Sequence, residues 1–548
     1  RREPFALDVD RGPLRVFRKT LVALAAAAAL VLSAGAVTLH RGNQNDPDTL
    51  DPHKASGSWE SNILGDLFLG LTTEDINADP MPGAAESWTV SDDGLVWTFK
   101  MRAGAVWSDG TPVTAQDFEY SFRRQLDPAT ASQYASMLYD IVNAEPVNAG
   151  TMPLEALGVK ALDDATLEIR LTHPATYLPQ LLMHQITYPV PRHVVEQYGD
   201  DWVSPEHYVS NGPFKLVSFR PNDSVVLARN ERFYDAANVK LDEVIFYPTD
   251  DGEAALKRFR IGELDLNVGF PSAQIDQLKR NMAAELRVAT VVNVRYIVMN
   301  TLRPPFDDIR VRQAIGLAID REVIAKQILR AGEVAAYSIV PPGTAGYTNG
   351  PRLSFADRPM AERIAEAKRL LAEAGHGPDN PISFRFNYIG DADSRRMAAA
   401  LQGMWAAVGL KVELVVSEKK VHYNTVRAQD SDVLQHRLSQ LVLLFQLRQE
   451  LPVPRPAFGR GHEHVALCQS GLREPGARLG PGARPGQAHG DHAAGRGDDA
   501  GGSAADPGVL WRQPQSGAHL GHGLGGQSAE RPPLALHDDR GPPLTGAA

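Results

Sequence analysis

The chain has 548 residues, 43% of them hydrophobic, which is enough to bury large cores in two or three domains. Its formal net charge of -10 argues against a nucleic-acid-binding protein, which would carry a basic patch or stripe. The single cysteine, Cys468, excludes a disulfide framework and a thiolate metal cluster.

Residues 1–36 have the pattern of a leader that directs export. A basic flank, R-V-F-R-K over 15–19, precedes the apolar run LVALAAAAALVL over 21–32, which is shorter than the roughly 20 residues of a membrane-spanning helix. Small residues over 33–36 then offer an A-x-A cleavage site. This pattern predicts a signal peptide and a periplasmic location, with an uncleaved membrane anchor as the alternative.

The first part of the body predicts a strand, a helix and a hairpin. An extended segment over 38–50 precedes a stretch over 63–71 whose apolar residues fall on one face of a helix. Asp93-Gly94 separates the β-type runs SWTVS and LVWTFKM, and it predicts a hairpin because glycine tolerates positive φ. Asp109-Gly110 repeats this hairpin pattern.

The rest of the body alternates helices and strands. Thr114 begins T-A-Q-D, a capping-box-like start that predicts a helix through Arg124. Two further hairpins are predicted, around Asp163-Asp164 and around 221–223. The remaining predicted elements are helices over 308–330, 360–375 and 393–408 and strands over 381–388 and 411–416. Interleaving of this kind indicates an α/β or mixed α+β protein built in several lobes.

The composition changes abruptly after Val433. Residues 434–548 contain no Ile, Lys, Asn, Tyr or Met, although the chain holds 14 Tyr and 10 Met. The absent residues are encoded mainly by A/T-rich codons. We hypothesise that 434–548 is an out-of-frame translation of a GC-rich gene and forms a disordered tail without a packed core beyond about residue 450. A natural Gly/Pro/Arg-rich tail is the alternative, and resequencing that finds an intact frame across codons 425–440 would support it.

No constellation of catalytic or metal-binding residues stands out in the sequence. The first 433 residues contain no G-x-S-x-G, Walker A, G-x-G-x-x-G or H-E-x-x-H motif. His462-Glu463-His464 has the wrong spacing for two metal ligands on one helical face. His53 follows Asp51-Pro52 in a turn, which is typical of a surface or core histidine. We therefore expect no catalytic residue, no metal and no cofactor, and a binding protein rather than an enzyme.

Several short blocks, collinear from about 40 to 433, resemble the periplasmic oligopeptide-binding proteins, the solute-binding subunits of peptide ABC importers. The most specific block is W-S-D-G-T-P-V-T-A-Q-D-F over 107–118. The others include T-L-D-P-H-K (49–54), V-K-A-L-D-D (159–164), N-G-P-F-K-L (211–216), G-E-L-D (262–265) and P-F-D-D-I-R-V-R-Q-A (305–314). Each block alone is weak, but their common order is specific.

The resemblance implies a three-lobed, type II-like clamp that acts as a monomer, closes around an oligopeptide and presents it to the membrane permease. Lobe I would be discontinuous, comprising 37–68 and 193–295, and lobe II would comprise 69–192. Lobe III would begin at 296 and be cut short at 433. Peptide would lie between lobes I and III as an added strand held by backbone hydrogen bonds.

The resemblance also marks candidate peptide-binding residues. One segment matches family residues whose backbone pairs with peptide, one tyrosine matches a cleft-facing region, and one lysine stands where the family commonly has a tryptophan wall. These candidates are Ser56, Gly57, Ser58 and Trp59, then Tyr134, then Lys419. The alternative for each is a loop or packing residue.

The largest departure from the family follows Val433. The family continues with an A-x-x-G-W segment and an acidic residue that grips the α-amine of the peptide, whereas this chain has L-Q-H-R-L-S and no Asp or Glu until Glu450. We expect the in-frame protein to capture oligopeptides and the chain as printed to bind none. Dipeptide, murein-peptide, nickel and sugar ligands stay open within the class. Two alternatives outside it are a secreted hydrolase whose active site lay in the lost C-terminus and a non-functional product of a frameshifted gene.

Overall fold

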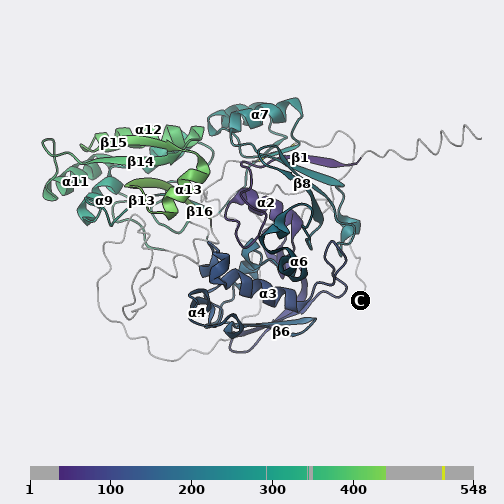
Figure 1. Cartoon of the computed structure of the whole chain (residues 1–548). Coiled ribbons are helices and arrows are strands. Elements are labelled where there is room, and N and C mark those ends of the chain that lie inside the picture. Colours follow the sequence, from purple (N-terminus) through teal and green to yellow (C-terminus); the bar gives the residue numbers. More distant parts are fainter. Residues whose placement is uncertain are drawn as a thin grey trace, which may run out of the picture.

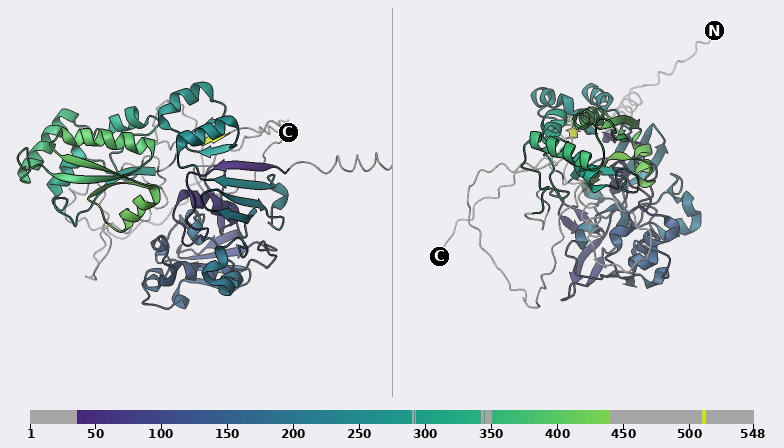
Figure 2. Two further views of the ribbon diagram at one scale, coloured as in Figure 1. Left: turned by 45° about the horizontal axis from the view of Figure 1, so that its top comes forward. Right: turned by 90° about the vertical axis from the view of Figure 1, so that its left-hand side faces the viewer.

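The computed structural model describes residues 36–289, 291, 293–341, 344, 350–439 and 509–511, so the predicted signal peptide and most of the tail lie outside the described residues. The described chain forms three lobes, each built on its own sheet, as the mixed α/β prediction anticipated. In Figure 1 the lobe built from residues after 293 lies at the left, and lobes I and II lie one above the other at the right. The separation of the left-hand lobe is also clear in Figure 2.

Lobe I contains a seven-stranded sheet with strand order β12-β17-β11-β1-β10-β9-β8. Its central strand β1 (Thr38–Gly42) runs parallel to both β10 (Glu243–Tyr247) and β11 (Leu266–Val268). The antiparallel strands are β8 (Phe214–Arg220), β9 (Ser224–Arg229), β12 (Leu286–Arg287) and β17 (Val509–Trp511). The helices of this part are α2 (Ser58–Leu67), α6 (Arg192–Tyr198), α7 (Gly252–Ile261) and α8 (Ile275–Asn281). The β8–β9 hairpin turns where the sequence predicted it.

Lobe II contains a four-stranded antiparallel sheet with order β4-β5-β7-β6. Its strands are β4 (Ala85–Val90), β5 (Val96–Met101), β6 (Val159–Asp163) and β7 (Thr166–Arg170), beside the small pair β2 (Thr72–Glu74) and β3 (Pro80–Pro82). The hairpins predicted at Asp93-Gly94 and Asp163-Asp164 are both present. The hairpin predicted at Asp109-Gly110 is instead a tight turn closed by one isolated bridge between Val106 and Pro112, because no β-type run follows the turn.

Helix α3 (Ala115–Leu126) packs on the lobe II sheet, with α4 (Ala144–Asn148) and α5 (Leu178–Leu181) nearby. Its start is the predicted capping box, in which the Thr114 N–H donates to Asp117 Oδ2 at 2.8 Å. Phe118 and Phe122 are buried on the inner face of α3, and Arg123 and Arg124 occupy its last turn. Of these two cations, Arg123 pairs with Glu119 one turn earlier in α3, and Arg124 reaches Asp51 of lobe I.

Lobe III contains a sheet with order β13-β16-β14-β15. Its strands are β13 (Asn293–Met299), β14 (Ser383–Ile389), β15 (Lys411–Ser417) and β16 (Val433–Ser439). Its main helices are α9 (Ile309–Leu317), α11 (Met360–Glu373), α12 (Ala392–Ala406) and α13 (Lys419–Arg427). The Trp405 indole is fully buried and packs edge-on against Phe384 and Phe386, with ring centroids 5.5 Å and 5.3 Å apart.

The single helix predicted over 308–330 is divided in the structure. Helix α9 ends at Leu317, and the Asp320 carboxylate then caps a short helix α10 (Arg321–Val323) by accepting from the Val323 N–H. A π-helical turn over Ile324–Leu329 follows. An aspartate in this position favours a helix start over continuation, because its side chain satisfies free backbone N–H groups.

Two strands lie beyond the predicted break at Val433. Strand β16 begins at Val433 and continues to Ser439, pairing with β13 along its whole length, and the Leu434 side chain is buried. Strand β17, at 509–511, lies within the lobe I sheet. Beyond about residue 450, where we expect no packed core, the structure thus describes one three-residue strand paired through its backbone, and the frameshift stays a hypothesis.

The hydrophobic cores group the lobes in two bodies. One continuous cluster joins lobe I side chains such as Phe68 and Phe214 to lobe II side chains such as Phe99 and Phe118. A separate cluster around Trp405 fills lobe III. Lobes I and II thus share a core, and most of lobe III is built around its own, although Val294 of β13 belongs to the shared cluster.

Candidate functional site

The predicted segment Ser56–Trp59 forms the N-terminal turn of α2. Gly57 is the N-cap in extended conformation, and its N–H donates to Glu60 Oε2 at 2.5 Å. A Cβ at Gly57 would lie 2.4 Å from the Trp59 ring, so only glycine fits this position without movement. Ser58 is half-buried at the first position of the helix.

The buried side chains of Glu60 and two asparagines form a hydrogen-bond network around this turn. Glu60 Oε1 accepts from the Asp48 N–H at 3.0 Å, and burial raises the pKa of the Glu60 carboxyl above its ordinary value. The Asn43 amide donates to the Trp59 carbonyl at 2.8 Å and accepts from the Asn62 amide at 3.1 Å. Because these polar groups are buried, the hydrogen bonds fix the turn in one position.

Lys419 lies across from this turn, on the first residue of α13. Its Nζ is 4.4 Å from the centroid of the Trp59 ring and donates to Gln44 Oε1 at 3.3 Å. The next residue, Lys420, forms an ion pair with Asp48 at 2.5 Å. A cation over an indole contributes on the order of 0.5–2 kcal/mol. Lobes I and III therefore meet here through two adjacent lysines, and they meet again where Asp393 and Arg396 of α12 contact Ser272 and where Arg330 pairs with Asp276.

Tyr134 brings lobe II to the same turn. Its hydroxyl donates to the Ser56 carbonyl at 3.0 Å, and its ring packs edge-on against His184 with centroids 5.7 Å apart. Burial lowers the pKa of His184 to about 4, so this imidazole is neutral near pH 7. The six predicted residues thus form one cluster: Trp59 contacts Lys419, Ser56 contacts Tyr134, and Gly57 and Ser58 complete the turn. Their role in holding ligand stays a prediction.

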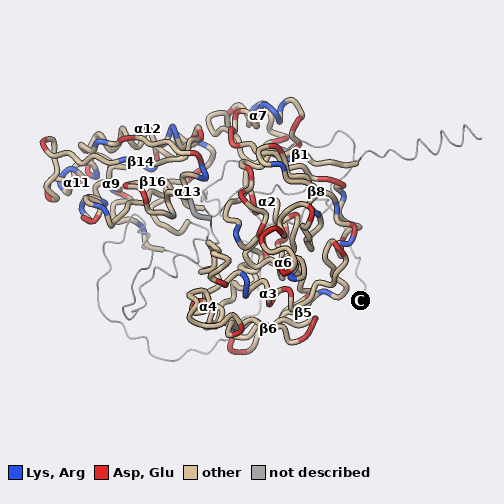
Figure 3. Tube along the Cα trace, viewed as in Figure 1, with Lys and Arg blue, Asp and Glu red and all other residues tan. Residues whose placement is uncertain are grey.

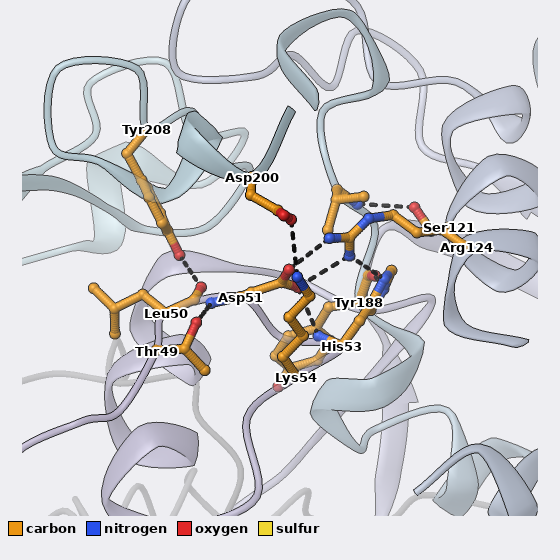
Figure 4. A network of polar contacts seen from close by, with 11 residues as sticks. Thr49, Leu50, Asp51, His53, Lys54, Ser121, Arg124, Tyr188, Asp200 and Tyr208 are labelled. Atoms are coloured by element: carbon orange, nitrogen blue, oxygen red, sulfur yellow. Dashed lines mark hydrogen bonds and ion pairs between the residues drawn. The ribbon is translucent and has the colours of Figure 1, made fainter. Parts of the chain in front are cut away.

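A second polar group joins lobes I and II beside this cluster (Figure 4). Arg124 donates to Asp51 with both terminal nitrogens, at 3.0 Å and 2.5 Å, and also to His53 Nδ1 at 2.8 Å. His53 Nε2 donates in turn to the Tyr188 carbonyl at 3.1 Å. We call the three side chains Asp51, His53 and Arg124 the seam.

The charges of the seam are set by burial and by one another. Burial alone would raise the pKa of Asp51, but the Arg124 guanidinium holds it below the usual value. Burial and the facing guanidinium lower the pKa of His53 to about 4, so the ring is neutral and accepts from Arg124. A bidentate arginine–carboxylate pair of this kind combines strength with geometric specificity.

The block W-S-D-G-T over 107–111 also joins lobes I and II. The Ser108 N–H donates to the Ser210 carbonyl at 2.8 Å, and Arg232 donates to the Ser108 carbonyl at 2.9 Å. The Asp109 carboxylate pairs with His193 at 2.7 Å. The most recognisable motif of the sequence is therefore structural, lying between two lobes and outside the cluster around Trp59.

Sequence reasoning missed the seam and Gln44. His53 was interpreted as a surface or core residue, and the structure places it wholly in the core as a partner of Arg124. The available signals were the D-P-H run over 51–53 and the basic residues at the end of the predicted helix that begins at Thr114. Nothing in the sequence indicates that these two segments contact one another. Gln44 carries a positive φ of 56° between two buried asparagines, a polar run that could have indicated a shaped loop.

The groups at the lobe I–III junction are suited to recognition. They comprise a cation, an indole and amide and carbonyl groups.

Within the described residues, no three His, Cys, Asp or Glu side chains converge to hold a metal ion. Over that same part of the chain, no helix combines the length and apolar character required to cross a bilayer. Acidic and basic residues are interspersed along all three lobes (Figure 3).

Comparisons with known proteins agree with this architecture. The family model of bacterial extracellular solute-binding proteins, family 5, matches residues 79–441. The periplasmic oligopeptide-binding protein OppA of Salmonella typhimurium is 39% identical over 417 residues, covering 74% of this chain and 76% of the relative. The crystal structure of Haemophilus influenzae OppA in complex with RPPGFSPFR has a TM-score of 0.72 at 34% identity, covering 74% of this chain and 81% of that one. The Escherichia coli murein tripeptide-binding protein MppA also has a TM-score of 0.72, at 33% identity, covering 75% of this chain and 80% of that one.

Proposed function

The chain belongs to the family 5 bacterial extracellular solute-binding proteins, and from that premise we propose that it captures oligopeptides for a peptide ABC importer. It is the binding component, which takes up peptide outside the cytoplasmic membrane and delivers it to the permease. Relatives named as periplasmic oligopeptide-binding proteins and a neighbour crystallised with a nonapeptide support this proposal.

The observation that carries the proposal is the meeting of lobes at Trp59. Lys419 of lobe III lies over the Trp59 ring of lobe I, and Tyr134 of lobe II donates to the Ser56 carbonyl on the same turn. Elements distant in the sequence thereby converge where a clamp would close. The separate core of lobe III allows this lobe to move against the other two.

The binding mode we propose uses backbone more than side chains. Gly57 is extended, but its N–H and the Ser56 carbonyl already bond Glu60 and Tyr134, so a peptide strand added at this turn would share or displace these hydrogen bonds. Affinity from main-chain bonds does not depend on the peptide's side chains, so this mode would accept varied sequences. Closure would then trap the peptide, and the ion pair and cation–ring contact would hold the closed form.

The finer features of the proposal concern export and partners. The leader over 1–36 would act as a signal peptide, and the mature protein would work as a monomer that presents the closed clamp to the permease. No catalytic step is required of the chain. These assignments follow from the basic-then-apolar leader and from the binding chemistry of the junction.

A second candidate is a non-functional product of a frameshifted gene. It is favoured by one observation: no Asp or Glu occurs between Val433 and Glu450, where the family resemblance places the carboxylate that grips the peptide's α-amine. Such a chain would keep lobes I and II but lose the charged anchor, and it would bind no peptide, as the sequence leads us to expect of the chain as printed; peptide capture would then belong to the in-frame protein.

Titration calorimetry of the full chain with di- to pentapeptides, together with thermal melts, distinguishes peptide capture from the alternatives. Peptide binding together with a cooperative melt that shifts upward supports peptide capture. A cooperative melt without any shift, combined with peptide hydrolysis, would replace the proposal with a secreted hydrolase. Absence of both binding and a cooperative melt would favour the non-functional product.

A further inference from the structure

A cavity beside helix α3, where lobe II meets lobe I, is separate from the cluster around Trp59. It encloses about 280 Å³ between α3, α6 and the 3₁₀ turn Leu154–Ala156, and its lining includes none of the six residues of that cluster. Pockets for drug-sized ligands measure roughly 300–1,000 Å³. The cavity therefore has room for one small molecule, whereas an oligopeptide would not fit.

Equal numbers of basic and acidic residues line this cavity. They are the arginines Arg123, Arg124 and Arg192 and the carboxylates Glu119, Asp127 and Glu155. Helix α3 lies between α6 and β6 (Figure 1), so adjacent residues of the helix face different neighbours. Glu119 faces β6, where its Oε2 accepts from the Ala161 N–H at 3.1 Å. Tyr120 faces α6, where the Arg192 guanidinium lies 5.7 Å from the centroid of the phenol ring.

The three arginines differ in how firmly they are paired. Arg123 pairs with Glu119 of the same helix at 2.5 Å, and Arg124 is held in the seam. Arg192 pairs with Glu196 at 2.7 Å, but both side chains are 53% exposed. An exposed pair of this kind contributes little to stability and can exchange its carboxylate for that of a ligand. Arg192 is therefore the guanidinium through which the cavity can recognise an anion.

A hydroxyl and two carboxylates of the cavity have hydrogen-bonding capacity that no described residue uses. The Tyr120 hydroxyl makes no hydrogen bond within the described chain, and burial raises the pKa of the phenol, so it stays protonated and can donate. Glu155 is exposed on the 3₁₀ turn, and no cation of the described residues pairs with it or with Asp127. Asp127 accepts from the Ala129 N–H at 2.9 Å through one oxygen. The cavity thus offers donors on the α6 wall and carboxylates elsewhere.

We propose that this cavity binds a small zwitterion, in which one ammonium and one carboxylate are joined by a short carbon chain. The carboxylate accepts from Arg192 and from the Tyr120 hydroxyl, and the ammonium donates to Glu155 and Asp127. Leu154 supplies an apolar contact for the chain between the two charges. A ligand with one charge leaves one set of these groups unused, so the cavity selects against it. The site is independent of peptide capture at the lobe I–III junction.

Titration calorimetry of the full chain with δ-aminovalerate tests the requirement for both charges. Valerate lacks the ammonium and pentylamine lacks the carboxylate, so each control ligand keeps the five-carbon chain and carries one charge. Because each loses its hydrogen bonds to charged groups on one wall, we expect both to bind at least about five-fold more weakly. Equal affinity of valerate or pentylamine would overturn the proposal, and so would absence of δ-aminovalerate binding.

Two variants with matched controls test whether the ligand lies in this cavity. Glu155→Gln should weaken δ-aminovalerate binding at least about five-fold, whereas Glu206→Gln, an exposed carboxylate outside the cavity, should not change it. Tyr120→Phe removes the hydroxyl and should weaken binding at least about three-fold. Its control is Tyr234→Phe, whose ring likewise lies under a guanidinium, at 4.1 Å, and this variant should bind normally. Unchanged affinity in Glu155→Gln or in Tyr120→Phe would contradict the proposed contacts.

A variant at the lobe I–III junction separates this site from peptide capture. Lys419→Ala changes the contact with Trp59 and leaves the cavity intact, so δ-aminovalerate should bind it as it binds the original protein. Loss of binding in Lys419→Ala with normal binding in Glu155→Gln would place the ligand at the junction and overturn the proposal. Peptide titration of Glu155→Gln completes the comparison, and its peptide affinity should equal that of the original chain.

Discussion

The seam between lobes I and II and the junction between lobes I and III differ in burial and in the strength of their polar contacts. In the seam, the Arg124 and Asp51 side chains are 12% and 3% exposed and joined by two hydrogen bonds. In the junction, Lys420 and Asp48 are 30% and 59% exposed and joined by one ion pair. Part-buried contacts of Ser272 with Asp393 and Arg396 add to this junction. The contrast between the two ion pairs nevertheless predicts a permanent connection between lobes I and II and a reversible one between lobes I and III.

The hydrophobic cores support the same distinction. Lobes I and II share one continuous cluster, so separating them would expose apolar surface at about 25 cal/mol per Å². Lobe III has its own core and need not expose it when the junction opens. A binding protein that opens and closes needs both kinds of contact. One holds lobes I and II together as a rigid unit, and the other breaks when lobe III moves away from them.

The largest expected effect comes from breaking the seam. Arg124→Ala leaves the Asp51 carboxylate buried without its partner, and the free energy of unfolding should fall by about 3–5 kcal/mol. The matched control is Arg192→Ala, whose pair with Glu196 is 53% exposed on both sides and should cost no more than about 0.5 kcal/mol. Urea denaturation measures both variants. Equal losses would contradict the description of the seam as a buried connection.

The seam should also weaken in acid. The pKa of His53 is about 4 in the folded state, below the ordinary value of 6.5, so the unfolded chain binds the proton more readily. Stability from the neutral ring is fully present above pH 6.5 and is lost as the pH falls toward 4, amounting to about 2–3 kcal/mol between pH 7.5 and 4.5. Urea titrations at both pH values should show a correspondingly smaller pH effect in His53→Gln. An identical pH effect in the two proteins would exclude this assignment.

A smaller effect is expected on the lobe I side of the junction. Gly57→Ala forces a Cβ against the Trp59 ring and should lower the free energy of unfolding by about 1–3 kcal/mol, with weaker peptide binding. Gly403→Ala lies within α12 where no heavy atom is near a Cβ, and it should instead add about 0.5–1 kcal/mol. Denaturation together with calorimetry distinguishes the two. A Gly57→Ala protein as stable as the original would contradict the close contact.

Local elements were predictable because their causes are local. The capping box at Thr114, the turns at Asp93-Gly94 and Asp163-Asp164, and the amphipathic helix α11 each depend on residues a few positions apart. The division of the 308–330 helix was missed because the cap at Asp320 competes with an otherwise continuous apolar pattern. Strand β17 was missed because three residues carry little signal without their neighbours in the sheet.

Contacts between lobes were not predictable from local pattern. Asp51 and Arg124 are 73 positions apart, and Gln44 and Lys419 are 375 apart. Family resemblance identified Trp59, Tyr134 and Lys419 as candidates, and the structure brings them to one turn. It did not identify His53 as a seam residue, because a histidine in a turn has no local feature that reveals a distant arginine.

The smallest effect is expected at the junction's surface pair. Lys420→Ala removes the ion pair with the half-exposed Asp48 and should change the free energy of unfolding by about 0.2–1 kcal/mol, less at high salt. The same change should shift the balance between open and closed clamps toward the open form, measurable by small-angle scattering. If Lys420→Ala lowered the free energy of unfolding as much as Arg124→Ala does, the distinction between junction and seam would be contradicted.

Distance measurement by spin labelling tests the central claim most directly. In a Cys468→Ser background, one label pair joins Val217 of lobe I to Leu162 of lobe II, and a second joins Val217 to Lys411 of lobe III, all at exposed positions. On peptide addition the first distance should stay constant while the second becomes shorter and more narrowly distributed. A change in the lobe I–II distance as large as that in the lobe I–III distance, or constancy of both on peptide binding, would contradict a rigid seam beside a reversible junction.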